Sequence, residues 1–169
     1  MTDMLLDISV FYDHGRGDPR ARAIIQRILS GDTTASVSPI TLFELWRSPD
    51  LDRRTEIRYV SMVTFLEEAP LTAEAAKMAG MWIADVEDDE RERLSRYALI
   101  AATARERGEP IATNDTEPFS RFHPSLVEFH PEPHRVISSA ALSCYLHISL
   151  VHRPQFRCSL LSEIVYPYL

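Results

Sequence analysis

Short apolar runs alternate along the chain with longer segments whose apolar residues recur at helical spacing. Residues 4–7 form an apolar run that ends in a carboxylate, the pattern of a buried strand whose end emerges at a polar site. Residues 34–37, 111–113 and 126–129 predict three more strands, and the stretch up to Leu71 has room for a short one. Strands that alternate with helices predict an α/β fold with a central parallel sheet.

Helix starts are marked by small polar residues that suit the N-cap position. Asp18 and Ser38 are each followed by proline, which is favoured in the first turn of a helix. They predict helices that run to Gly31 and to the Ser48-Pro49 pair. Residues 52–66 are also expected to be helical, and a cap at Thr72 predicts a further helix through about residue 83.

A dense charge run covers residues 85–96 and is followed by strong helix formers in the segment YALIAATARER. We expect a solvated loop over the charge run and a buried helix after it. The breaker Gly108-Glu109-Pro110 should close that helix.

Size and charge restrict the class of protein. With 169 residues, of which 45% are hydrophobic, the chain can bury one core, which predicts one domain over residues 1–130. A formal net charge of -7 argues against binding of nucleic acid by bulk attraction, so a nucleic-acid enzyme of this charge needs metal ions and a few arginines.

The C-terminal segment, residues 131–169, differs in composition from the rest. From His130 onward glycine is absent, and four of the six histidines and both cysteines occur there. We keep three interpretations open: an added element that packs on the core, a partner-binding extension, or a tail without function. With Cys144 and Cys158 both near the C-terminus, no disulfide framework is expected in the main body.

Localisation is predicted from what the chain lacks. The first residues reach an acidic side chain at once and do not form a signal peptide, and no apolar run is long enough to cross a bilayer. We therefore expect a cytoplasmic protein without a membrane partner.

Three carboxylates occupy positions where a parallel sheet would bring them together. Asp7 and Asp115 follow predicted strands, and Glu44 lies on the helix after the second strand. Ligands of open parallel sheets bind beyond the carboxyl ends of the strands. Taken singly, each acid has a structural explanation as a turn cap, a surface helix residue or an Asx turn. Taken together they predict a site for Mg²⁺ or Mn²⁺, which prefer oxygen ligands and can promote phosphodiester hydrolysis.

Three segments, in order, resemble the PIN-domain family: LLDISV, SPITLFELWR and LIAATARERGEPIATNDTEPF. The resemblance extends over roughly the first three-quarters of the chain. It implies a three-layer α/β/α fold and a ribonuclease that depends on Mg²⁺ or Mn²⁺. It also implies the toxin of a VapBC toxin-antitoxin pair, a VapC-type protein that is commonly a homodimer and is inhibited by its antitoxin.

Residue by residue, the resemblance makes Asp7, Glu44 and Asp115 the catalytic acids, which also bind the metal together with Glu117. The family commonly has small polar residues in support of the site where this chain has Ser9 and Thr113. A further match fails at Ile8, where the family usually has Thr or Ser.

The main departure from the family is Tyr97, which stands where an aspartate usually precedes the LIAATA helix. A protonated phenol cannot replace a carboxylate as a metal ligand. The resemblance therefore leaves two functions open: an active nuclease with a weakened site, or an impaired module that still binds RNA or an antitoxin. Nearby Asp85, Asp88 and Asp89 are more simply part of a solvated charge run.

Arginines in or beside the segments that resemble the family are weaker candidates for phosphate contact. Arg47, Arg96 and Arg105 would serve if they faced the crevice, although each is more simply an exposed helix residue.

Overall fold

The computed structural model describes residues 2–49, 51–123 and 125–128. Residues 131–169, the predicted tail, lie outside the described residues, so the predicted domain boundary stays a prediction. In chain order the elements are β1 (Met4–Leu6), α1 (Ile8–Arg16), α2 (Pro19–Leu29), β2 (Ala35–Val37), α3 (Pro39–Trp46), α4 (Arg53–Val63), β3 (Glu67–Glu68), α5 (Ala73–Ala84), α6 (Asp88–Arg107), β4 (Ile111–Thr113), α7 (Thr116–Ser120) and β5 (Leu126–Glu128).

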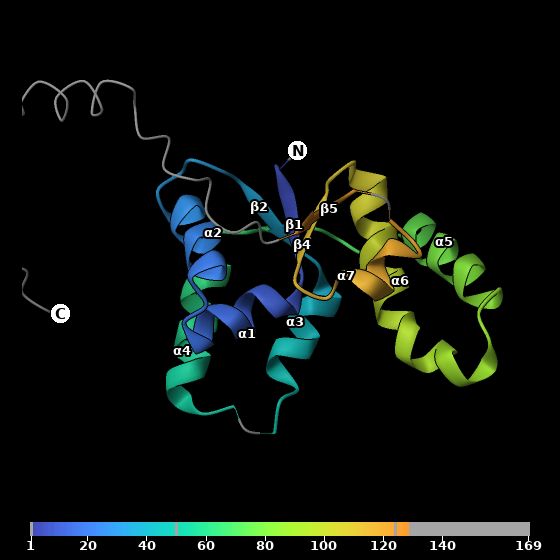
Figure 1. Cartoon of the computed structure of the whole chain (residues 1–169), viewed down its shortest axis with the longest axis horizontal. Helices are drawn as coiled ribbons and strands as arrows, with labels where there is room; N and C mark the ends of the chain where they lie inside the picture. Colours follow the sequence, from blue (N-terminus) through green and yellow to red (C-terminus); the bar gives the residue numbers. More distant parts are fainter. Residues whose placement is uncertain (1, 50, 124, 129–169) are drawn as a thin grey trace, which may run out of the picture. The chain divides into compact units, whose positions relative to one another are not determined.

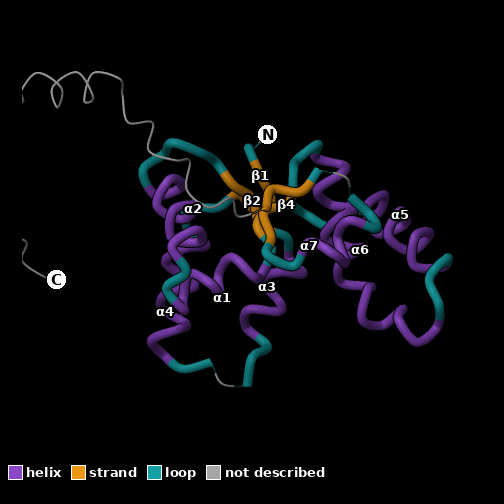
Figure 2. The backbone as a smooth tube through the Cα atoms, in the orientation of Figure 1, coloured by secondary structure: helices purple, strands orange, loops and turns teal. Residues whose placement is uncertain are grey.

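The strands form one parallel sheet in the order β3-β2-β1-β4-β5, with β1 at its centre. Figure 2 draws the strands in orange and labels β1, β2 and β4 among them. Leu5 of β1 is in register with Ser36 on one side and with Ile111 on the other. All strands point the same way, so the residues that follow β1 and β4 lie at the same edge of the sheet. This edge carries Asp7 and Asp115.

Side chains of β1 alternate between two hydrophobic cores, as the period of a strand requires. Leu6 belongs to a core formed with α1, α2, α3 and α4, and Leu5 belongs to a second core formed with α5, α6 and α7. Both side chains are fully buried. Figure 1 shows these two groups of helices on opposite sides of the sheet. The predicted α/β fold with three layers is confirmed.

The N-caps expected from the sequence are present. Asp18 accepts a hydrogen bond from the backbone N–H of Arg20 at 2.8 Å, and Ser38 accepts one from Thr41 at 3.1 Å. Thr72 likewise caps α5. These caps satisfy backbone donors that a helix cannot pair internally, so α2, α3 and α5 begin where the local sequence predicts.

Helix α1 was not expected from the sequence. It starts directly after Asp7, which caps it, and ends at Gly17, whose φ of 86° is the left-handed conformation that favours glycine at a helix C-terminus. Its buried residues Ile8, Val10 and Phe11 pack into the first core.

The predicted solvated loop over residues 85–96 is wrong. Helix α6 begins at Asp88 and includes most of the charge run. Its first turn holds Asp88, Asp89 and Glu90, and negative charge there is stabilised by the positive end of the helix dipole. Within the described part of the chain, no helix combines the length and the apolar character that a membrane span needs.

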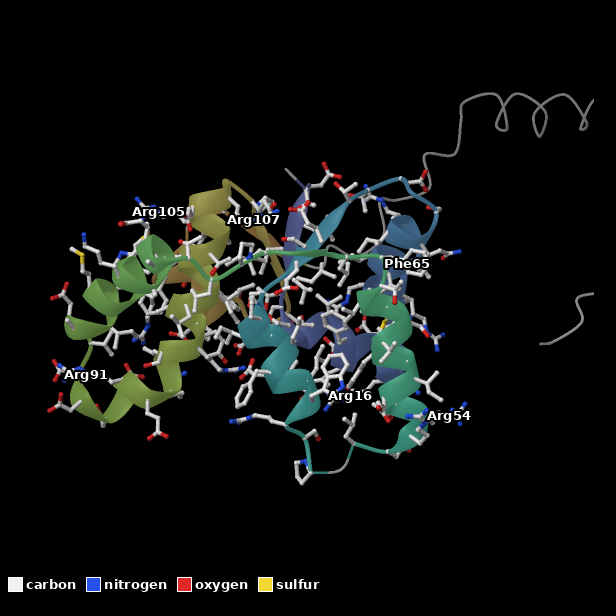
Figure 3. The ribbon with its side chains drawn as sticks, turned by 180° about the vertical axis from the view of Figure 1, so that it is seen from behind. Arg16, Arg54, Phe65, Arg91, Arg105 and Arg107 are labelled. Atoms are coloured by element: carbon white, nitrogen blue, oxygen red, sulfur yellow. The ribbon has the colours of Figure 1, made fainter. Side chains whose placement is uncertain are left out.

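A buried ion pair lies at the edge of the sheet opposite to Asp7 and Asp115. Glu109, just before β4, is 1% exposed and accepts hydrogen bonds from Nε and Nη2 of Arg107 at 3.0 and 2.8 Å. Ser36 and Thr2 also donate their hydroxyls to it, each at 2.5 Å. Figure 3 labels Arg107 at the end of α6 that lies away from Arg91. The sequence predicted only a helix breaker here.

Candidate active site

Asp7 is held at the carboxyl end of β1 by hydrogen bonds to one of its two oxygens. Its Oδ2 accepts from the hydroxyl of Thr113 at 2.9 Å and from the backbone N–H of Ser9 at 3.3 Å. The side chain is buried, with 2% of its surface exposed. Its other oxygen, Oδ1, is shielded from solvent and has no hydrogen-bond partner among the described residues.

Two hydroxyls connect Asp7 to the loop after β4. The Ser9 and Thr113 hydroxyl oxygens are 3.2 Å apart. Ser9 Oγ accepts from the backbone N–H of Asn114 at 3.0 Å, and Thr113 Oγ1 accepts from that of Asp115 at 3.0 Å. Ser9 and Thr113, which the resemblance places in support of the site, therefore both contact Asp7. Their hydroxyls also hold the loop that carries Asp115 close to Asp7.

Glu44 reaches the same edge from α3, and an arginine from α6 neutralises it. Nη1 of Arg96 donates to both carboxylate oxygens of Glu44, at 2.8 and 2.9 Å. Glu44 is 7% exposed. Burial would lower the pKa of Arg96, but the charge of Glu44, the Tyr97 side chain, the hydrogen bonds to Glu44 and the charge of Asp7 together outweigh burial and raise that pKa, so Arg96 is charged.

Tyr97 contacts Asp115 and Arg96 through its hydroxyl. The hydroxyl donates to Oδ2 of Asp115 at 2.5 Å and accepts from Nη2 of Arg96. Cζ of Arg96 also lies 4.1 Å from the centre of the Tyr97 ring, within range of a cation–π contact. Burial, together with the bond to Asp115, raises the pKa of Tyr97 to about 12. The phenol therefore stays protonated and acts as a hydrogen-bond donor.

A pocket of about 450 Å³ lies at this edge of the sheet. Its lining residues are Asp7, Ile8, Ser9, Tyr12, Glu44, Arg47, Arg96 and Asp115. Asp7, Glu44 and Asp115, which the sequence predicts to converge, share this lining. The close pairing of Arg96 with Glu44 had no specific signal in the sequence, since Arg96 is one of many arginines in a charge run.

Other candidates lie elsewhere. Glu117 is an exposed residue of α7 that pairs with Arg121 at 3.2 Å, and it is not among the lining residues. Asp88 forms an ion pair with Arg91 near the start of α6. The guanidinium of Arg105 lies 5.6 Å from the centre of the Trp82 ring and outside this pocket.

The chemistry of the pocket fits a hard divalent cation at Asp7. A buried carboxylate oxygen without a partner is costly, and a cation is one way to compensate it. Glu44 and Asp115 already have partners in Arg96 and Tyr97. Accordingly, within the described residues no three His, Cys, Asp or Glu side chains are grouped closely enough to hold a metal ion.

Solved structures share this fold. VapBC2 from Rickettsia felis, bound to a DNA fragment from its promoter, has a TM-score of 0.56 and 18% identity, covering 74% of this chain and 96% of that chain. A toxin-antitoxin complex from Klebsiella pneumoniae has a TM-score of 0.58 and 18% identity, with coverage of 76% and 99%. DNA-bound VapBC from Salmonella typhimurium has a TM-score of 0.57 and 20% identity, covering 77% of this chain and 100% of that chain.

At these identities the likeness shows a shared fold. No curated protein matches the chain. The sequence model of the PIN domain does match, over residues 4–123. This span begins at β1, includes Asp7, Glu44 and Asp115, and ends just after α7. Since that span is more than half of the chain, this protein belongs to the PIN domain family.

Proposed function

We propose that this protein is a divalent-metal-dependent endoribonuclease that hydrolyses RNA phosphodiester bonds, as the toxin of a toxin-antitoxin pair. PIN domains are generally nucleases, which supports the reaction class. The observation that carries the proposal is the lining of one pocket by Asp7, Glu44 and Asp115, at the edge where parallel strands end. The net charge of -7 adds to it, because an acidic protein needs local cations to approach RNA.

The proposed roles follow from the side chains around the pocket. Asp7 would hold the ion through Oδ1, while Thr113 and Ser9 keep its carboxylate oriented through Oδ2. A bound Mg²⁺ or Mn²⁺ supplies Lewis acidity toward a phosphodiester and lowers the pKa of water. Asp115 and Glu44 are the further acids of the site, and Glu117 would need its helix or side chain to rearrange in order to join them.

An antitoxin is the partner we propose, and a homodimer is the proposed assembly. The antitoxin is proposed because the fold is shared with proteins of toxin-antitoxin complexes. Large apolar side chains on α3 and α4 are exposed, among them Phe43 at 62%, Ile57 at 53% and Val60 at 50%, and such side chains suit a protein partner. An antitoxin arginine placed against the pocket carboxylates would match their charge.

The test is cleavage of a structured RNA by the purified full chain with Mg²⁺ or Mn²⁺, beside an Asp7→Asn variant and a sample with chelator. We expect cleavage that needs the ion and falls at least about a hundredfold in Asp7→Asn, which keeps the shape but loses the charge. Cleavage that persists in Asp7→Asn would place the chemistry elsewhere.

Tyr97 supports a second candidate, an impaired PIN module that binds RNA or an antitoxin without turnover. Its phenol stands where the family usually has a carboxylate, and it remains protonated. In this case the unaltered chain would be inactive with either ion, and Tyr97→Asp would restore cleavage. Efficient turnover by the unaltered chain would exclude the impaired module.

A further inference from the structure

We infer that Arg96 competes with the divalent cation for Glu44. Its guanidinium binds the carboxylate oxygens that a metal ion would otherwise bind, and this competition sets the cation affinity of the site. This inference rests on the proposed metal site, and it concerns the regulation of that site by the chain's own residue. It gives Arg96 a function in the site, whereas the sequence indicated only an exposed residue of a helix.

The contact between Arg96 and Glu44 uses both oxygens that could ligate an ion. Nη1 donates to Oε1 at 2.8 Å and to Oε2 at 2.9 Å. The Glu44 side chain is 8% exposed and that of Arg96 is 35% exposed. Because the carboxylate is shielded from water, its attraction to a charge is screened less than that of a surface pair. While Arg96 holds these bonds, its positive charge opposes the approach of a metal ion to the same two oxygens.

Tyr97 keeps Arg96 in this position. The guanidinium lies over the Tyr97 ring, and Nη2 donates to the Tyr97 hydroxyl. That hydroxyl donates its own proton to Asp115. Two acids of the pocket are therefore engaged by neighbouring residues of α6, and within the described residues Oδ1 of Asp7 is the one buried carboxylate oxygen without a hydrogen-bond partner.

Competition of this kind lowers the apparent affinity for the ion. When a binding-competent state is only partly populated, the apparent dissociation constant rises in inverse proportion to its population. Here the competent state is the one in which Arg96 has left Glu44. Removing the guanidinium leaves Glu44 buried and without its counter-charge, which makes a cation its best remaining partner.

The test is titration of the full chain with Mn²⁺ alone, with the free ion measured by electron paramagnetic resonance, so that no RNA and no activity are involved. We compare the unaltered chain with Arg96→Gln and with Arg47→Gln. Arg47 lines the same pocket and carries the same charge, but its guanidinium lies 5.9 Å from the centre of the Phe43 ring. Arg96→Gln should bind Mn²⁺ about tenfold tighter or more, and Arg47→Gln within about threefold of the unaltered chain.

A double-mutant cycle with Glu44→Gln separates direct competition from a general loss of positive charge. In the Glu44→Gln background, Arg96→Gln should add little to Mn²⁺ affinity, because the contested carboxylate is gone. Circular dichroism checks that each variant is folded, and Arg96→Lys, which keeps the charge but offers a less directional donor, serves if Arg96→Gln does not fold. Arg96→Lys should then bind Mn²⁺ more tightly than the unaltered chain.

The inference is overturned if removal of the guanidinium leaves Mn²⁺ affinity unchanged or weaker, or if Arg47→Gln tightens binding as much as Arg96→Gln. The proposed nuclease function can fail separately. In that event Arg96→Gln binds Mn²⁺ more tightly, yet neither it nor the unaltered chain cleaves RNA.

Discussion

The hydroxyl of Thr113, the last residue of β4, donates to Oδ2 of Asp7, the first residue after β1, at 2.9 Å. Because β1 and β4 are neighbouring parallel strands, this bond ties together the two strand ends that carry Asp7 and Asp115. Both partners are buried, at 0% and 2% exposure, so water does not compete for the bond. The hydroxyl of Thr113 thus orients the Asp7 carboxylate from the neighbouring strand.

Thr113→Val keeps the shape of this side chain and removes the hydroxyl. We expect Mn²⁺ affinity and any metal-dependent cleavage to fall by about 10- to 100-fold, the usual effect of losing a residue that orients a metal ligand. Thr113→Ser, which keeps the hydroxyl, should retain most of the affinity. Titration with Mn²⁺ measures both variants, and equal affinities for Val and Ser would show that the hydroxyl has no orienting role.

The ion pair of Arg107 with Glu109 supports stability at the opposite edge of the sheet. Arg107→Ala would leave Glu109, with 0% side-chain exposure, buried without its cation, and we expect a loss of about 3 kcal/mol in the free energy of unfolding. Urea denaturation followed by circular dichroism measures this change.

Arg53→Ala is the control for the loss of an ion pair as such. Arg53 pairs with Glu56 at 3.0 Å, but its side chain is 79% exposed, and pairs of this kind contribute less than about 1 kcal/mol. Similar losses in Arg53→Ala and Arg107→Ala would contradict the importance of burial at Glu109.

Acid should unfold the protein partly through Glu109. Burial would raise the pKa of Glu109, but the hydrogen bonds that it accepts, that from Arg107 first, outweigh burial and hold the pKa below its usual value. A carboxyl with a depressed folded-state pKa contributes stability above the unfolded pKa, and this contribution is lost as the pH falls through the folded-state value. Stability should therefore decrease more steeply below about pH 4.5 in the unaltered chain than in Glu109→Gln. Parallel curves in acid urea titrations would contradict this prediction.

At alkaline pH the stability of the fold should decrease partly through Tyr97. Burial and the bond to Asp115 raise the pKa of Tyr97 to about 12, above the usual value of 10.0. A group with a raised folded-state pKa contributes stability below the unfolded pKa and loses it as the pH rises toward the folded-state value. Relative to Tyr97→Phe, the unaltered chain should therefore lose about 1 kcal/mol between about pH 9 and pH 11. Urea titrations across this range test it, and no difference between the two proteins would mean that the phenol has an ordinary pKa.

Local features of the sequence determined most of the fold. Asp18, Ser38 and Thr72 marked helix starts because a short polar side chain and the next turn of backbone suffice to form a cap. The strand at residues 111–113 was predicted with its observed bounds. The acids Asp7, Glu44 and Asp115 could be expected at one edge, because a parallel sheet brings the ends of its strands together.

Contacts between distant segments decided the rest. The start of α6 in the charge run before Tyr97 is an exception, because helical propensity and the acidic residues of the first turn are local features that favour a helix over the expected loop. Arg96 pairs with Glu44, and Arg107 pairs with Glu109. Which charged groups pair in this way depends on how the folded chain buries and orients them. Sequence supplies the charged groups, and packing decides which of them are shielded from water and close enough to pair, because an ion pair gains strength only where the solvent is excluded.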